Sequence, residues 1–161
     1  MSYRVWILFH LLGVTLFFSN FVAALFWKQR ADRRRDPRVV AHTFHTLVAS
    51  DLWITPFAVI VIVASGVGAA IQAGLPLLGT GWILWSIAAF ILSGLFAVLG
   101  AFPLQRSIAG WADAARGNSD DFDWPRYERE SRRWAHWAHA SLLAAGIAMV
   151  LMVLRPDLPA L

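Results

Sequence analysis

The stretch Asp51-Leu52-Trp53-Ile54-Thr55-Pro56, followed by the apolar run Phe57 to Ala70, decides the fold. It places a carboxylate and a proline at the start of a segment that is long enough to cross a membrane as a helix. Because a helix rises 1.5 Å per residue, about 20 apolar residues span the roughly 30 Å of bilayer hydrocarbon. Other apolar segments of the chain must then pack around this one.

The apolar residues fall into four such blocks. Of the 161 residues, 58% are hydrophobic and only 15% are charged, whereas a soluble domain carries about 25% charged residues. The blocks also lack the polar stripe that each helix of a water-soluble bundle would show. We therefore predict an all-α protein, a four-helix transmembrane bundle of up-down-up-down order, forming a single domain over residues 1–161. The expected spans are about residues 5–27, 47–72, 82–104 and 134–154.

The positive charges predict how these spans are oriented. Twelve of the 14 Lys and Arg residues lie in segments 28–38 and 105–133, which fall on the same side of a four-span protein. The positive-inside rule makes both segments cytoplasmic loops. Both termini then lie on the outer, periplasmic side of a bacterial inner membrane. Attraction to anionic lipid headgroups accounts for the net charge of +4 without any nucleic-acid partner.

Two capping patterns predict where the second and fourth helices begin. Asp36 followed by Pro37 is typical of an N-cap with proline at the first helical position. Asp123, with Pro125 two residues on, is expected to open the fourth helix in the same way. Both starting points precede the apolar blocks, so helices 2 and 4 are expected to extend into the cytoplasm.

Five histidines are candidate metal or haem ligands: His10, His42, His45, His136 and His139. The last four form two pairs with a spacing of three, so each pair shares one helix face near the cytoplasmic side. Imidazoles from two helices can bind zinc, copper or haem iron. His10 lies toward the opposite membrane face and could serve only a separate site. The alternatives are interfacial, solvated imidazoles, a hydrogen bond from His10 to a backbone carbonyl, or a proton-coupled switch.

Four polar or aromatic positions are the candidate functional residues: His10, Asn20, Asp51 and Trp53. An ionisable group at membrane depth is a functional candidate by default. The competing interpretation of Asp51 is structural, as a helix-capping group or as an ion pair with a cytoplasmic arginine such as Arg106 or Arg133.

Short phrases spread along nearly the whole chain resemble the DUF2269 family of predicted bacterial integral membrane proteins. These phrases are His10-Leu11-Leu12-Gly13, Asn20, Phe26-Trp27-Lys28, Arg30-Ala31-Asp32, Asp51-Leu52-Trp53, Thr55-Pro56, Gly66, Trp82, Trp85, Ser93-Gly94, Pro103-Leu104-Gln105, Tyr127, Ser131-Arg132-Arg133-Trp134 and Leu151-Met152-Val153-Leu154-Arg155-Pro156. The resemblance implies a four-span inner-membrane protein. It includes His10 and the Asp51–Trp53 element but not the paired histidines.

No phosphate-binding loop, catalytic triad order or HExxH motif is found, and the chain has no cysteine for a thiolate site. This favours a non-catalytic accessory or assembly component of a membrane complex, in contact with lipid and other subunits. The alternative is a membrane redox protein that binds haem b or copper through histidine and works with quinone. A small transporter is a weaker option, because few polar residues line a possible pathway.

Overall fold

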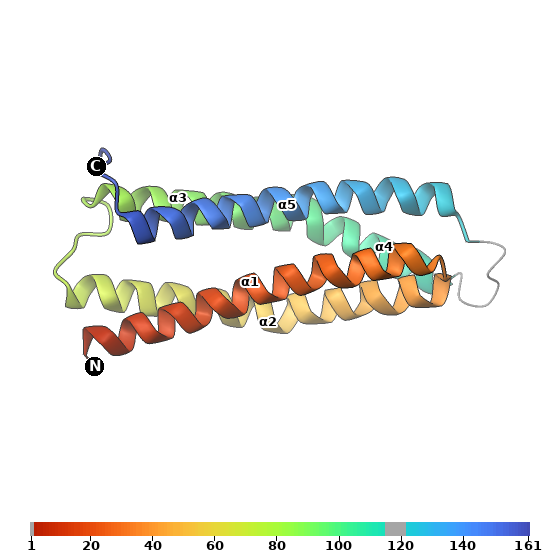
Figure 1. Ribbon diagram of the computed structural model, residues 1–161, viewed down its shortest axis with the longest axis horizontal. Helices are drawn as coiled ribbons and strands as arrows, with labels where there is room; N and C mark the ends of the chain where they lie inside the picture. Colours follow the sequence, from red (N-terminus) through yellow and green to blue (C-terminus); the bar gives the residue numbers. More distant parts are fainter. Residues whose placement is uncertain (1, 115–121) are drawn as a thin grey trace.

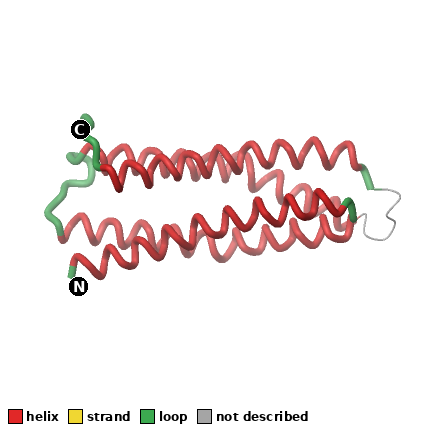
Figure 2. Tube along the Cα trace, viewed as in Figure 1, coloured by secondary structure: helices red, strands yellow, loops and turns green. Residues whose placement is uncertain are grey.

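The computed structural model describes residues 2–114 and 122–161, and all of their regular secondary structure is helical (Figure 2). Within these described ranges, five α-helices and one π-helical segment follow one another (Figure 1). Their bounds are α1 Tyr3–Arg34, α2 Pro37–Gln72, α3 Gly81–Phe96, η1 Ala97–Ala101, α4 Phe102–Ala114 and α5 Trp124–Leu154. The all-helical fold is confirmed for the described residues.

Both predicted helix starts are confirmed. α2 begins at Pro37, and the Asp36 side chain accepts a hydrogen bond of 2.8 Å from the Arg38 backbone N–H. The Asp123 side chain likewise accepts one of 2.9 Å from the Arg126 backbone N–H at the start of α5. In each case a proline lies in the first turn, where it removes no intrahelical hydrogen bond.

The helices are arranged as two antiparallel pairs. α1 packs most extensively on α2, and α3 on α5. The two chain termini and the α2–α3 connection lie at one end of the bundle, and the α1–α2 connection lies at the other (Figure 1). The last residues close the terminal end, since the Leu161 backbone N–H donates to the Leu78 carbonyl at 3.1 Å.

The segment η1 redirects the third long helix from one pair to the other. The Phe102 N–H donates to the Ala97 carbonyl five residues earlier, which widens this turn. Pro103 follows immediately, and the wider turn gives its ring the room that a regular α-helix would deny it. Beyond this point α4 packs mainly on α2 and only slightly on α5 (Figure 1). The sequence did not indicate that helix continues past Gln105 to Ala114.

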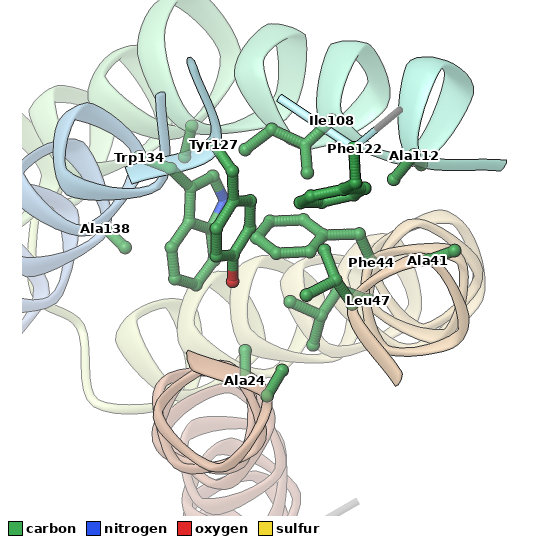
Figure 3. Packing of buried hydrophobic residues seen from close by; sticks show 14 residues of the cluster. Ala24, Ala41, Phe44, Leu47, Ile108, Ala112, Phe122, Tyr127, Trp134 and Ala138 are labelled. Atoms are coloured by element: carbon green, nitrogen blue, oxygen red, sulfur yellow. The ribbon is translucent and has the colours of Figure 1, made fainter. Parts of the chain in front are cut away.

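Aromatic rings surrounded by alanines form the core at the end of the bundle opposite the termini. The Phe44 ring lies edge-on to Tyr127 and Trp134, with centroids 6.2 and 5.9 Å away (Figure 3). Small side chains around them allow the helices to approach closely, and these include Ala24, Ala41, Ala101, Ala109, Ala112 and Ala138. A second core cluster around Phe17, Ala58 and Ala145 continues toward the terminal end.

Much of the remaining surface is apolar. Counting α3, η1 and α4 as one, the part of the chain that the structure describes has four helical segments long and apolar enough to cross a membrane: Tyr3–Arg34, Pro37–Gln72, Gly81–Ala114 and Trp124–Leu154. Large apolar side chains such as Leu99 and Val153 are more than two-thirds exposed, at 71% and 73%. Such a surface is stable in hydrocarbon and not in water.

We predict that Gly100→Ala will destabilise the protein. A Cβ atom at Gly100 would lie 2.1 Å from the Trp137 ring, which packs against η1. Overpacking of this kind costs about 1–3 kcal/mol. The matched control is Gly94→Ala on α3, where an added Cβ meets nothing within 4 Å. Thermal unfolding in detergent should show a lower melting temperature for Gly100→Ala only. Equal melting of the two variants would contradict the close approach of η1 to α5.

Candidate functional site

Polar side chains from four helices meet midway along the bundle. They are Asn20 from α1, Asp51 and Thr55 from α2, Gln105 from α4 and Trp134 from α5. We call these five residues the Asp51 centre. Asp51 is partly buried, whereas the other four side chains are buried. Two of the sequence-predicted candidates, Asn20 and Asp51, are therefore brought together.

The Asp51 carboxylate is the common acceptor of this centre. Its Oδ1 accepts from Asn20 Nδ2 at 3.1 Å and from Thr55 Oγ1 at 3.0 Å. Its Oδ2 accepts from Gln105 Nε2 at 3.0 Å. Asn20 Nδ2 also donates to Thr55 Oγ1 at 3.1 Å, so the threonine hydroxyl accepts one hydrogen bond and donates another. The Asn20, Thr55 and Gln105 donors thus all point toward the Asp51 carboxyl oxygens.

Gln105 carries the network on to the fourth long helix. Its Oε1 accepts a 3.1 Å hydrogen bond from Trp134 Nε1. An amide has both donors and an acceptor, so Gln105 can bond Asp51 on one side and Trp134 on the other. The centre thus connects α1 and α2 to α4 and α5 through side chains alone.

Local sequence explains why these groups converge. Asp51 and Thr55 are four residues apart and share one face of α2. The wide turn of η1 comes just before Gln105 and directs α4 onto α2. The alanines Ala24, Ala101 and Ala138 line the same space and allow the close approach of their helices.

Very little empty space remains beside the Asp51 centre. The adjoining cavity measures about 10 Å³ and is lined by Phe21, Phe102, these alanines and three residues of the centre, Asp51, Gln105 and Trp134. Such a volume is at the lower limit for holding a single water molecule. Ligand pockets in proteins are generally about 300–1,000 Å³. The centre is therefore closed to any organic ligand in this conformation.

Asp51 makes no ion pair with any residue in the described ranges. The arginine partner considered from the sequence, Arg106 or Arg133, is replaced by amide and hydroxyl donors. Gln105 and Trp134 were not among the sequence candidates. Both lie in phrases that resemble the family, but neither residue type signals a role without the fold.

His10 and Trp53 lie outside the Asp51 centre. His10 Nδ1 is 2.9 Å from the Ile62 carbonyl and 3.4 Å from Ser65 Oγ, so its imidazole joins α1 to α2 nearer the terminal end. This is the carbonyl contact weighed from the sequence. Trp53 is 76% exposed and points away from the bundle, as expected of a side chain that contacts lipid or headgroups.

The four paired histidines all lie on exposed faces: His42, His45, His136 and His139. His45 Nε2 lies 3.6 Å from Asp113 Oδ1, and His139 Nδ1 donates to the Ala135 carbonyl at 2.6 Å. Within residues 2–114 and 122–161, no three His, Asp or Glu side chains are grouped to hold a metal ion.

A family model described as "Predicted integral membrane protein (DUF2269)" matches residues 5–156, nearly the whole chain. The chain belongs to the DUF2269 family. Together with its four apolar helical segments, this makes it a multi-pass integral membrane protein. No curated protein and no solved structure matches it. The DUF2269 description names no activity, so a function must be argued from the Asp51 centre.

We predict that Asp51→Asn will destabilise this DUF2269 protein. In either orientation of the new amide, its nitrogen would take the place of an acceptor oxygen and would face a donor of Asn20, Thr55 or Gln105. Leaving a buried donor without its acceptor costs about 1–3 kcal/mol, so a loss of about 2 kcal/mol is expected. The control is Asp157→Asn in the exposed C-terminal segment. Wild-type thermal stability of Asp51→Asn in detergent would show that these bonds stabilise nothing.

Proposed function

We propose that the protein is a non-catalytic accessory or assembly component of a larger membrane complex. The main support for this proposal is that the Asp51 centre has no free polar group and no space for a ligand. Its amide, hydroxyl and indole donors are bonded to other side chains of the same chain. Among the described residues, no buried side-chain nitrogen or oxygen lacks a partner. Polar groups that are satisfied internally, beside a cavity of about 10 Å³, hold helices in place and leave no room for a substrate.

The lateral surface is what such a protein offers to other subunits. A helix in lipid gains little from burying apolar side chains, because the lipid tails are equally apolar. Association therefore depends on shape and small residues. Gly94 and Gly146 both have open space where a Cβ would lie, so another helix could approach their backbones closely. These positions support lateral contacts with other membrane helices.

The proposed orientation is a bacterial inner-membrane protein of up-down-up-down order with both termini on the outer side. Its support is the charge distribution, with 12 of 14 basic residues in segments 28–38 and 105–133. The helices α2 and α5 begin at Pro37 and Trp124. Both starts precede the expected spans 47–72 and 134–154, so each helix would extend beyond the hydrocarbon on the cytoplasmic side.

Purification from the native membrane in mild detergent tests this function. We expect a colourless, metal-free protein that co-purifies with defined membrane subunits in fixed stoichiometry, identified by mass spectrometry. The co-purification should be lost in harsh detergent, because lateral helix contacts compete with detergent. An unrelated four-span protein with the same affinity tag is the control for non-specific capture.

The same sample tests the redox alternative. A stoichiometric Soret band or bound copper would contradict the accessory role. Single substitutions His10→Ala, His42→Ala, His45→Ala, His136→Ala and His139→Ala would then identify the ligands.

A further inference from the structure

A polar cavity of about 220 Å³ lies between the last turns of α1 and the first turns of α5. It shares no residue with the Asp51 centre. Its lining includes Lys28 from α1, the C-cap residue Arg35 that follows this helix, and Trp124, Glu128 and Arg132 from α5. We propose that this cavity, the Arg132 cavity, binds the phosphate group of a phospholipid headgroup.

The carboxylate of Asp32 lines one side of the Arg132 cavity, and Lys28 already neutralises its charge. Asp32 lies 2.7 Å from Lys28 Nζ and accepts hydrogen bonds from Tyr127 at 2.5 Å and from Ser131 at 3.3 Å. Tyr127 precedes the expected span 134–154. Burial, and next the hydrogen bond to Asp32, raise the pKa of Tyr127, so its hydroxyl remains a donor. The Asp32 carboxylate is thus neutralised locally and repels an incoming anion only weakly.

The remaining cations can receive that anion. Arg35 donates to Glu128 at 2.9 Å and lies over the Trp124 ring at 5.2 Å, which uses part of its donor set. Arg132 is exposed and makes no ion pair with any residue that the structure describes. The lining as a whole has three cations and two carboxylates. The excess of one positive charge matches the single negative charge of a phosphodiester, and arginine is well suited to phosphate geometry.

The position of the cavity along the helix favours a lipid as the source of the phosphate. Lys28 immediately follows the apolar segment 5–27, and Arg35 is seven residues further along. At 1.5 Å per residue this is roughly 10 Å, close to the 5–8 Å or so that the headgroup layer occupies on each side. Phe26 and Trp27, just before the cavity, are 53% and 55% exposed. Neither side chain lines the cavity, but exposed aromatic rings at this level of α1 are typical of the edge of the hydrocarbon, where lipid phosphates also lie.

Native mass spectrometry of the full-length, delipidated protein tests the proposal. The two lipids are phosphatidylglycerol and a diacylglycerol with the same acyl chains, which differ by the phosphate headgroup. The test variant is Arg132→Gln. The matched control is Arg133→Gln on the same helix, which removes the same charge from an exposed residue outside the lining. A thermal-shift series with sodium phosphate in lipid-free detergent, at constant ionic strength, tests soluble phosphate as the source.

We expect wild type and Arg133→Gln to retain phosphatidylglycerol in preference to diacylglycerol. Arg132→Gln should retain about fivefold less, as expected for losing one basic residue near an anionic headgroup. Equal lipid-free melting temperatures would show that the variants fold alike. Equal retention by Arg132→Gln and Arg133→Gln, or equal binding of both lipids, would overturn the proposal. Stabilisation by inorganic phosphate that depends on Arg132, without lipid preference, would overturn the lipid assignment.

Discussion

The Asp51 carboxyl group must be hydrogen-bonded because it is partly buried between helices that are long and apolar enough to cross a membrane. A buried charge or carboxyl group without hydrogen-bond partners costs several kcal/mol. Its own helix supplies only Thr55, so the other donors must come from α1 and α4. This requirement selects one relative placement of the helices. Purely apolar packing in lipid would select among placements much less sharply, because lipid tails and apolar side chains are interchangeable neighbours.

The π-helical segment η1 brings the Gln105 donor of α4 to Asp51. The turn at η1 widens just before Pro103, and Gly100 lets the backbone approach the Trp137 ring. These two features allow one helix to pack on α5 in its first half and on α2 in its second. Gln105 follows directly and reaches Asp51 on one side and Trp134 on the other. The widened turn before Pro103 and the hydrogen bonds of Asp51 therefore favour the same helix arrangement.

Sequence reasoning predicts those features that depend on local pattern. The lengths of the apolar blocks predict the four long helices. Asp36-Pro37 and Asp123 predict two helix starts, because capping is a contact between near neighbours in the chain. It also places Asn20 and Asp51 among the candidates. It does not identify Gln105 or Trp134, because their roles arise from packing between residues 29 and 54 positions apart. The π-helical turn has no comparably strong signal, so the path of α4 is learned only from the structure.

The central claim is that the Asp51 centre holds one helix pair against the other. The chain contains no cysteine, so spin labels can be placed at His42→Cys on α2 and Arg129→Cys on α5, both exposed positions. Pulsed electron paramagnetic resonance in lipid nanodiscs then gives the distance between the pairs, and labels at Gln29→Cys and His42→Cys give a distance within one pair. Introducing Asp51→Ala should broaden the first distribution and leave the second unchanged. A first distribution as narrow as in the parent protein would contradict the claim.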